Sequence, residues 1–553
     1  MAPAYALVLS LAVTAPLFAP GYLLLRDAVS TPRSYLSDTA LGLAEAAPRA
    51  LPQDFAVVLL SSVIDGGVAV KLLLIVGLWL AGWGAARLAG VVVPDSGMAG
   101  QFVATTLAIW NPYVAERLLQ GHWSLIVGYG CLPWVAAAML RLREPEAGWA
   151  DVGALVFWIA LAGLTPTGLM LAASVAVACV FAPGAGWRRW RCAAVALGAA
   201  LVAALPWLTA AVVASSLAPS QAEGVAAFAA RAEPGLGTLA TLASLGGIWN
   251  SEAVPASRTT LFAVVAAIVL LGIVALGLPV AIRSRAAVPL LCLAALAVVV
   301  PALMATGPGL AAVEATVRTL PGLGVLRDAQ KWVALAVPGY ALAGAAAVVP
   351  LRQKLSGLPA AATALVCCAA LIATLPDLAW GVGGQVAPVV YPAGWARAAA
   401  IINDDPRPVA VLPVDSMRRF EWAGDAPALD PLPRWVRADV LSTGDLTIGG
   451  RTVPGEGERA RAVQQLLLDG ADREKLADAG VGWVVVESSG ATHALALPVA
   501  YHDDDITLYR TGGDVPEAPG RGVVLAAHLA WLALLLGGLV GLISRAWGVR
   551  RRR

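Results

Sequence analysis

Residues 67–90 read GVAVKLLLIVGLWLAGWGAARLAG, and only Lys71 and Arg87 are charged within this run. A run of this length and character predicts an α-helix that crosses a lipid bilayer. Lys71 lies near one end of the run, where a lysine can extend its ammonium group to the interface. Eleven more apolar runs predict a polytopic α-helical membrane protein with about twelve transmembrane helices. They cover residues 5–25, 99–114, 123–140, 152–165, 167–183, 193–214, 259–281, 287–305, 331–350, 358–376 and 521–544.

The composition of the whole chain agrees with this interpretation. The 553 residues are 59% hydrophobic and 13% charged, and the mean hydropathy is +0.75. Ordinary soluble domains carry roughly a quarter charged residues. The composition therefore excludes a cytosolic enzyme, a secreted domain and a disordered chain. The six cysteines lie in or beside apolar runs and offer no CxxC metal site.

The few charges are sorted along the chain. Residues 377–520 hold 21 acidic and 12 basic side chains, whereas the remainder holds 15 acidic and 26 basic ones. Because basic loops stay in the cytoplasm, this pattern predicts a plasma-membrane protein with both termini cytoplasmic and its long loops outside. The basic clusters that set this orientation are Arg87, Arg141 with Arg143, Arg188 with Arg189 and Arg191, Arg283 with Arg285, Arg352 with Lys354, and Arg545 with residues 550–553.

Residues 377–520 are long enough for a small folded domain. Residues 408–414 and 481–487 are typical of buried strands, residues 506–509 of a short third strand, and residues 456–479 of a helix between them. A strand, a helix and a strand in this order predict a βαβ unit. We therefore expect three parts: a transmembrane core over 1–376, an extracytoplasmic α/β domain over 377–520, and a final transmembrane helix with a basic tail over 521–553.

The first outer loop carries an acid directly after the first apolar run. Asp27 lies where the head group of a lipid-phosphate donor would be presented, and a carboxylate there can act as general base on an acceptor hydroxyl. Arg26 is a candidate for holding a phosphate. Asp38 is a second acidic candidate, although it also fits as the N-cap of a helix over 39–47. The plainer alternative is that Arg26 and Asp27 only mark the membrane boundary and pair locally.

Two further outer loops concentrate polar side chains. Residues 111–123 place Glu116, Arg117 and His122 in a short connection between apolar runs, and we expect this loop beside the first one if the first four spans bundle together. They are candidate acceptor-site or accessory residues. Trp249, in the loop 215–258, is a further candidate of that kind, and interfacial anchoring is the plainer role for such an aromatic residue.

The stretch LRDAQKW over 326–332 forms the third group. Arg327 and Lys331 flank the start of an apolar run, where backbone N–H groups and two cations suit an anion such as a donor phosphate. The alternative is an interfacial anchor with extended basic side chains. Cations at an outer helix end run against the positive-inside trend. No metal-binding motif is present, and no basic, aromatic-interleaved patch predicts nucleic-acid binding.

Together these features resemble the GT-C superfamily of polytopic glycosyltransferases, whose weak signature is an acid in the first outer loop. The chain is more closely similar to the membrane core of the actinobacterial α-(1→3)-arabinofuranosyltransferase family. The similar stretches are 65–87, Leu132-Pro133-Trp134, Leu164-Thr165-Pro166-Thr167, Leu205-Pro206-Trp207-Leu208, Trp249-Asn250 and 326–332. The first outer loop is shorter here than in that family, and the long carbohydrate-binding extension of its large members is absent.

The resemblance implies a polyprenyl-phosphate sugar as the donor and a cell-envelope glycan or glycolipid as the acceptor. It implies Asp27, with Asp38 as runner-up, as the catalytic carboxylate, and Arg327 and Lys331 as donor-phosphate contacts. The sugar stays open between arabinofuranose and mannose, since one scaffold serves both. Two alternatives remain: a non-catalytic relative that handles envelope lipids or acts as a scaffold, and a transporter. The sequence shows neither the paired broken helices nor the midplane charges of a transporter.

Overall fold

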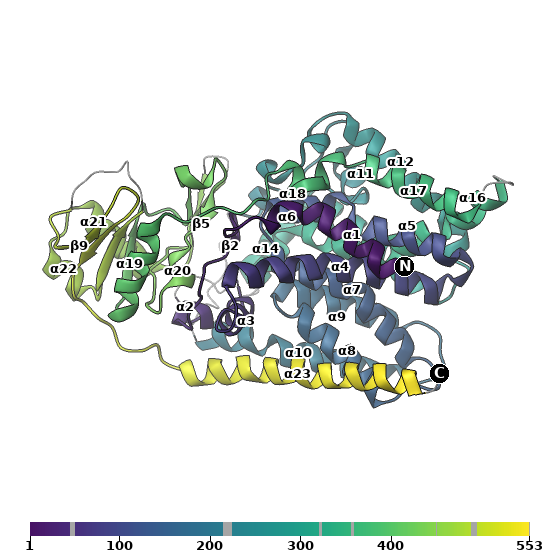
Figure 1. Ribbon diagram of the computed structural model, residues 1–553, viewed down its shortest axis with the longest axis horizontal. Coiled ribbons are helices and arrows are strands. Elements are labelled where there is room, and N and C mark those ends of the chain that lie inside the picture. Colours follow the sequence, from purple (N-terminus) through teal and green to yellow (C-terminus); the bar gives the residue numbers. More distant parts are fainter. Residues whose placement is uncertain are drawn as a thin grey trace.

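The computed structural model describes residues 1–44, 50–213, 224–319, 323–354, 359–448, 451–487 and 495–551. The chain forms an elongated bundle of apolar helices with a small α/β domain at one end (Figure 1). Each apolar run overlaps a helix. These helices are α1 (Ala2–Thr14), α4 (Gly66–Val92), α5 (Gly97–Ile109), α7 (Trp123–Leu142), α8 (Trp149–Ala162), α9 (Pro166–Val180), α10 (Arg189–Val213), α12 (Phe262–Ala281), α13 (Val288–Met304), α15 (Ala336–Ala346), α17 (Ala360–Ala373) and α23 (Arg521–Arg551).

Six helices in the described ranges are long and apolar enough to cross a membrane, so the chain has the character of a helical membrane protein. The number rises to eight if each of two bent pairs is one span. In one pair α13 meets α14 (Gly307–Thr319) at 91°, and in the other α17 meets residues Pro376–Gly383 at 78°. Three further apolar helices, α8, α9 and the stretch Ala2–Phe18, are shorter. The count of twelve spans therefore stays a prediction.

The two breaks qualify the expectation that broken helices are absent. In each pair the bend follows the end of a complete apolar helix, which for α13 is 17 residues long. A helix of that length rises about 26 Å before the bend. Each bent pair is a broken span or a re-entrant loop, so the expectation that broken helices are absent is not met.

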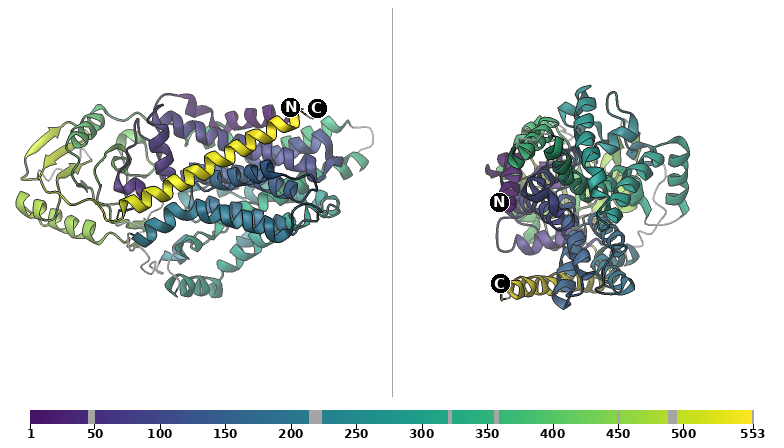
Figure 2. Two further views of the ribbon diagram at one scale, coloured as in Figure 1. Left: turned by 90° about the horizontal axis from the view of Figure 1, so that it is seen from below. Right: turned by 90° about the vertical axis from the view of Figure 1, so that its right-hand side faces the viewer.

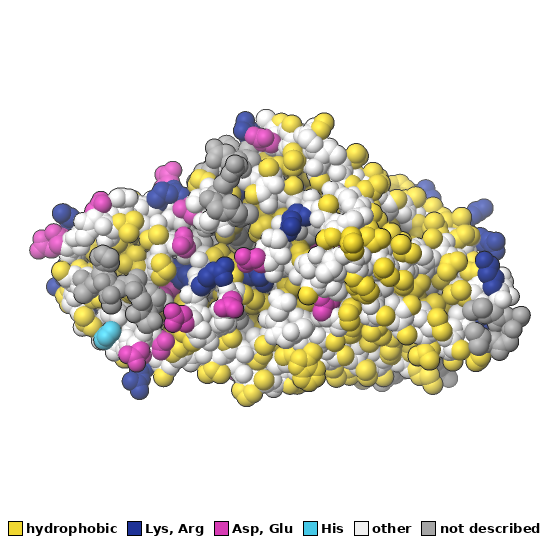
Figure 3. Space-filling view, turned by 90° about the horizontal axis from the view of Figure 1, so that it is seen from above, with side chains coloured by type: hydrophobic (Ala, Val, Ile, Leu, Met, Phe, Trp, Pro, Cys, Tyr) yellow, Lys and Arg dark blue, Asp and Glu magenta, His cyan; other side chains and the backbone are white. Residues whose placement is uncertain are grey.

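Both chain termini lie at the end of the bundle that faces away from the α/β domain (Figures 1 and 2). Ion pairs join the helix ends there, since Asp151 at the start of α8 contacts Arg141 at the end of α7 and Arg545 near the end of α23. On the face in Figure 3, hydrophobic side chains cover much of the bundle, acidic ones gather toward the α/β domain together with several basic ones, and basic ones stand at the opposite end. This distribution is what an apolar bilayer between two aqueous layers requires.

The α/β domain is built on a four-stranded sheet in the order β3-β8-β10-β9. The strands β3 (Val409–Leu412) and β8 (Trp483–Val486) pair in parallel, as the βαβ pattern predicts. β10 (Thr507–Arg510) runs antiparallel to both β8 and β9 (Val499–His502). The predicted helix over 456–479 is two helices, α21 (Glu458–Leu468) and α22 (Arg473–Asp478), because the chain turns at Gly470 with φ 73°. A further helix of the domain, α19 (Ala393–Asp404), packs on the sheet on the side toward the bundle.

The remaining regular elements are short. Three further two-stranded sheets pair β1 (Leu24–Leu25) with β2 (Ala28–Val29), β4 (Met417–Arg418) with β5 (Ala428–Leu429), and β6 (Leu446–Ile448) with β7 (Arg451–Val453). Short helices connect the longer ones; they are α2 (Asp38–Leu41), α3 (Gln53–Leu60), α6 (Pro112–Leu119), α11 (Gly237–Ala243), α16 (Val348–Lys354) and α20 (Leu432–Trp435).

The first outer loop is part of the α/β domain as well as of the bundle. Tyr22 exchanges backbone hydrogen bonds with Val389, and the N–H of Arg26 donates to Pro427 at 2.8 Å. Leu24 and Val29 belong to the same buried cluster as Trp395 of α19. The α/β domain therefore packs directly on the loop that carries Asp27. The predicted domain boundary at residue 376 does not indicate this contact.

The short helix of this loop differs from the one expected over 39–47. Ser37, and not Asp38, caps it, since the Ser37 hydroxyl accepts from the N–H of Ala40. The helix ends after Leu41 because Gly42 takes a left-handed conformation with φ 80°. Residues 45–47 lie outside the described ranges.

Candidate functional site

Four loops that are distant in sequence meet where the helical bundle adjoins the α/β domain. The first is the hairpin of β1 and β2, whose two-residue turn is Arg26-Asp27. The second is the segment from α6 to the start of α7. The third spans residues 244–253, and the fourth spans residues 323–331. Their polar side chains form one connected network of hydrogen bonds, and we call this network the loop cluster.

The local sequence explains how α6 presents its polar residues. Asn111 caps the helix by accepting from the N–H of Val114 at 3.1 Å, and proline suits the first helical position that follows. At the other end Gly121 has φ 82°, and an added Cβ would lie 2.3 Å from the backbone nitrogen of Ala28. Glycine is thus required there because the second loop presses against the Asp27 hairpin.

Asp27 combines partial exposure with fixed hydrogen-bond partners in the loop cluster. Its Oδ2 lies 2.9 Å from Nε2 of His122 and accepts from Nε2 of Gln120 at 3.1 Å. Its backbone N–H donates to the Gln120 carbonyl. The Oδ1 atom accepts no hydrogen bond from any described residue, and the side chain is 38% exposed. One oxygen of this carboxylate is therefore fixed by the protein and the other is open to a ligand.

His122 is neutral in this arrangement, and its neighbours set the tautomer. The guanidinium of Arg117 lies 3.2 Å from Nδ1, so Nδ1 is assigned as the hydrogen-bond acceptor. Nε2 then carries the hydrogen and donates a hydrogen bond to Asp27. Burial lowers the pKa of His122 below its usual range, although the Asp27 carboxylate acts in the opposite direction. A second proton on Nδ1 would point at a guanidinium, so the imidazole orients Asp27 and does not relay protons.

The carboxylate of Asp27 is correspondingly stabilised as an anion. Burial acts to raise its pKa, but the hydrogen bonds from His122 and Gln120 and the positive charge of Lys331 outweigh burial and hold the pKa at about 2. The Asp27 carboxylate is therefore ionised at every physiological pH.

Behind this pair lies a buried ion network centred on Arg117. Its side chain is fully buried and donates to both oxygens of Asp328, at 3.0 and 3.3 Å, and to Gln330. Lys331 reaches the same Asp328 at 3.5 Å and is itself 23% exposed. Burial acts to raise the pKa of Asp328, but Arg117 and Lys331 outweigh it and hold the pKa at about 2. Lys331 thus keeps donors available toward the open side.

Glu116 has a structural position beside this network. Its carboxylate accepts from the backbone N–H groups of Gly247 and Ile248, at 3.0 and 3.2 Å, and from Gln330 at 2.8 Å. It is fully buried, and burial followed by the nearby carboxylate of Glu233 raises its pKa well above the usual range. Glu116 therefore holds the third loop against α6, and its side chain is not accessible to an acceptor substrate.

The structure places the other expected residues as follows. Arg26 is 4% exposed and donates to the carbonyls of Leu119 and Glu252, so it ties loops together and has no guanidinium donor facing a phosphate. Asp38 forms an ion pair with Arg521 at the start of α23, away from Asp27 in the hydrogen-bond network. Arg327 lies over the ring of Phe228, 5.4 Å from its centroid.

Trp249 also packs on Phe228, and its neighbour Asn250 donates to Gln120 at 2.8 Å. Sequence reasoning missed Gln120, Asp328 and Gln330 as members of the loop cluster. Gln120 lies in the expected loop, and Asp328 stands between two expected cations, so the only available signal was proximity to residues already singled out. None of the side chains in the described ranges forms a group of three or more potential metal ligands.

No family model matches the chain, and no curated protein matches it in sequence.

Proposed function

We propose that the protein is a membrane glycosyltransferase of the GT-C type, similar to the arabinofuranosyltransferases of actinobacteria. It would transfer arabinofuranose or mannose from a polyprenyl phosphate to a cell-envelope acceptor outside the membrane. The observation that carries the proposal is the open Oδ1 of Asp27 beside the partly exposed Lys331, at the end of an apolar bundle. Twelve spans and cytoplasmic termini are part of this proposal.

The chemistry needs a group that receives the acceptor proton and a group that stabilises the leaving phosphate. The acceptor hydroxyl donates to Asp27 Oδ1, its oxygen forms a bond to the anomeric carbon, and its proton passes to the carboxylate. The bond between that carbon and the phosphate oxygen breaks, and polyprenyl phosphate leaves with the electron pair. Lys331 lies in the same electrostatic neighbourhood as Asp27 and supplies a cation for that phosphate.

The remaining residues of the loop cluster act through these two. His122 and Gln120 hold Oδ2 and so turn Oδ1 outward. Arg117 fixes the tautomer of His122. It also forms an ion pair with Asp328, so Asp328 offsets only part of the positive charge of Lys331. In this proposal they are positioning residues.

One observation favours the alternative of a non-catalytic relative that handles envelope lipids. A carboxylate with a pKa of about 2 is a weak proton acceptor near neutral pH. For catalysis, the incoming phosphate has to draw Lys331 away from Asp27 and so raise the pKa of Asp27. A lipid-handling relative needs no such change.

The test is transfer from synthetic polyprenyl-phosphate arabinofuranose and polyprenyl-phosphate mannose to envelope extracts by the full chain in membranes. We expect Asp27→Asn to lower the transfer rate by about 10²- to 10⁴-fold, the range typical of a lost general base. Asp38→Asn is the matched control and should keep wild-type activity, because Asp38 pairs with Arg521. Full activity of Asp27→Asn refutes the catalytic role. A folded wild type that transfers neither sugar supports the non-catalytic relative.

A further inference from the structure

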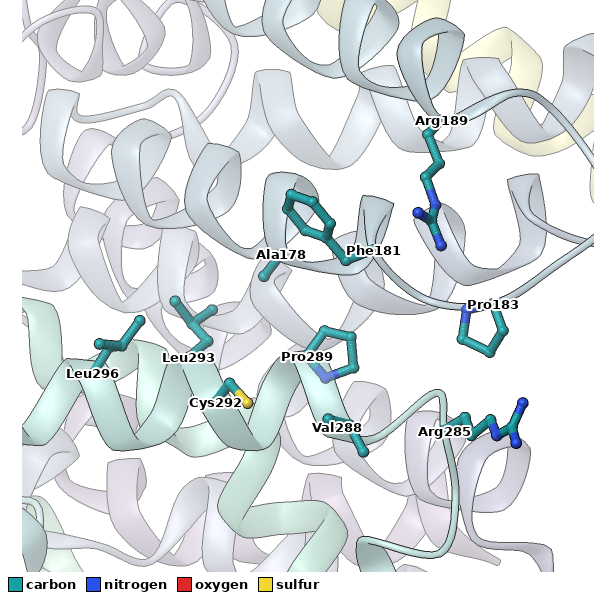
Figure 4. A pocket seen from close by; sticks show the side chains of 10 residues that line it. All are labelled: Ala178, Phe181, Pro183, Arg189, Arg285, Val288, Pro289, Cys292, Leu293 and Leu296. Carbon is teal, nitrogen blue, oxygen red and sulfur yellow. The ribbon is translucent and has the colours of Figure 1, made fainter.

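An apolar groove lies on the bundle at the end opposite the loop cluster. It is formed by the end of α9, the start of α10 and the first half of α13, and its volume is about 600 Å³ (Figure 4). Ligand pockets typically have volumes of about 300 to 1,000 Å³. Phe181 and Leu296, which line it, are 64% and 58% exposed, so the groove opens on the outside of the bundle.

Two arginines stand at one end of this groove. Figure 4 shows Arg189 and Arg285 toward one side, whereas Leu293 and Leu296 lie toward the other. Both arginines are exposed, and neither forms an ion pair or hydrogen bond with a residue of the described ranges. An open apolar groove with two unpaired guanidinium groups at one end is complementary to a molecule with an apolar chain and an anionic head.

We propose that this groove binds one anionic phospholipid from the bilayer leaflet next to the chain termini. The phosphate is held by Arg189 and Arg285, since a guanidinium offers paired N–H donors in the geometry that phosphate oxygens accept. One acyl chain lies along Phe181, Leu293 and Leu296. A free anion would leave the apolar wall uncovered, and a neutral lipid would leave the two cations unpaired.

The location agrees with the chemistry of that leaflet. The groove lies at the end with both termini and the basic helix ends, which the positive-inside rule assigns to the cytoplasm. The cytoplasmic leaflet is the one that carries anionic lipids, and basic pockets between transmembrane helices recognise such head groups. The site shares the cytoplasmic position of the termini with the proposed function but does not depend on the glycosyltransferase chemistry.

Native mass spectrometry of the full chain, released from detergent, tests the site with dioleoyl phosphatidylglycerol and dioleoyl phosphatidylcholine as probes. We expect one phosphatidylglycerol to be retained in preference to phosphatidylcholine. The double variant Arg189→Ala, Arg285→Ala should weaken that binding about 30-fold or more, because it removes both guanidinium groups that donate charge-assisted hydrogen bonds to the phosphate.

The matched control is Arg188→Ala with Arg283→Ala, which removes two exposed cations from the same end without changing the groove lining. It should change phosphatidylglycerol binding by less than about twofold. Equal losses in both double variants would mean that only general surface charge attracts the lipid, and would overturn the proposal. Equal retention of the two lipids by wild type would overturn it as well.

A second measurement requires no substitution. Cys292 lines the groove and is exposed, whereas the other five cysteines are buried. Phosphatidylglycerol should slow alkylation of the Cys292 thiol by N-ethylmaleimide in detergent, and phosphatidylcholine should leave the rate unchanged. Alkylation that is insensitive to both lipids contradicts occupation of the groove.

Discussion

Replacing Arg117 by methionine tests the buried network that supports Asp27. Arg117 is fully buried and donates to both Asp328 oxygens, so its removal leaves a carboxylate that is 5% exposed without its main partner. Loss of one partner of a buried ion pair typically costs about 3 to 5 kcal/mol. Lys331 stays 3.5 Å from Asp328 and offsets part of that loss. We therefore expect a loss of about 3 kcal/mol in the free energy of unfolding, at the lower end of the range.

The measurement is unfolding of the full chain in mixed micelles at increasing dodecyl sulfate, followed by tryptophan fluorescence. Arg318→Met is the matched control, because it breaks an exposed ion pair with Glu314 and should cost less than about 1 kcal/mol. Asp328→Asn in the Arg117→Met background should recover about 2 kcal/mol, since the stranded charge is gone. If Arg117→Met costs no more than Arg318→Met, or if the two changes at Arg117 and Asp328 add independently, the reasoning is refuted.

Two further predictions concern the loop cluster. Because burial lowers the pKa of His122, the unfolded chain binds the extra proton first, so this residue should reduce stability as pH falls below about 6.5. Unfolding of wild type and His122→Gln at pH 7.5 and 5.5 checks this, and an equal pH dependence in both would contradict it. Gly121→Ala should cost about 2 kcal/mol or more, because φ is 82° and the new Cβ would lie 2.3 Å from Ala28 N. Gly198→Ala in α10 has open space and should leave thermal stability unchanged or slightly raised.

The sequence predicted the apolar helices because each depends on a local property, a run of side chains that water excludes. It predicted less well which helices span a membrane. Residues 152–165 and 167–183 coincide with α8 and α9, but both helices are short by the length criterion. Where a helix stops depends on turn chemistry and packing. Gly42 ends α2, and Gly470 divides the helix between β3 and β8, because both glycines have a positive φ. The sequence pattern around a glycine does not predict whether its φ is positive.

The candidate site shows a similar division. Asp27, Arg117, His122 and Lys331 were singled out from charge alone, because polar residues next to apolar runs are few. The hydrogen-bond and ion-pair partners that position these side chains lie far away in sequence. Arg117 pairs with Asp328 across 211 positions, and no periodic pattern encodes such a contact. Arg26 illustrates the converse, since its adjacency to Asp27 indicated a phosphate contact, whereas its guanidinium instead donates to Leu119 and Glu252.

The cations of residues 326–332 run against the positive-inside trend, and one of them, Lys331, is partly offset by Asp328 of the same stretch. Lys331 and the buried Arg117 both contact Asp328, so one carboxylate offsets only part of their combined charge. Further ion pairs toward the α/β domain include those of Arg26 with Glu252, Arg258 with Glu233, Arg434 with Asp54, and Arg521 with Asp38. At the opposite end, Arg189 and Arg285 have no acidic partner in the described ranges.

Membrane orientation responds to charges that a leaflet can attract, and a cation that is already paired within the fold attracts little. By the same reasoning Lys331 is distinctive, because its partner Asp328 is shared with Arg117 and its side chain is 23% exposed. An anion that approaches Asp27 from outside would meet Lys331 as a cation with donors to spare, and Lys331→Met should therefore weaken donor binding more than Arg327→Met does.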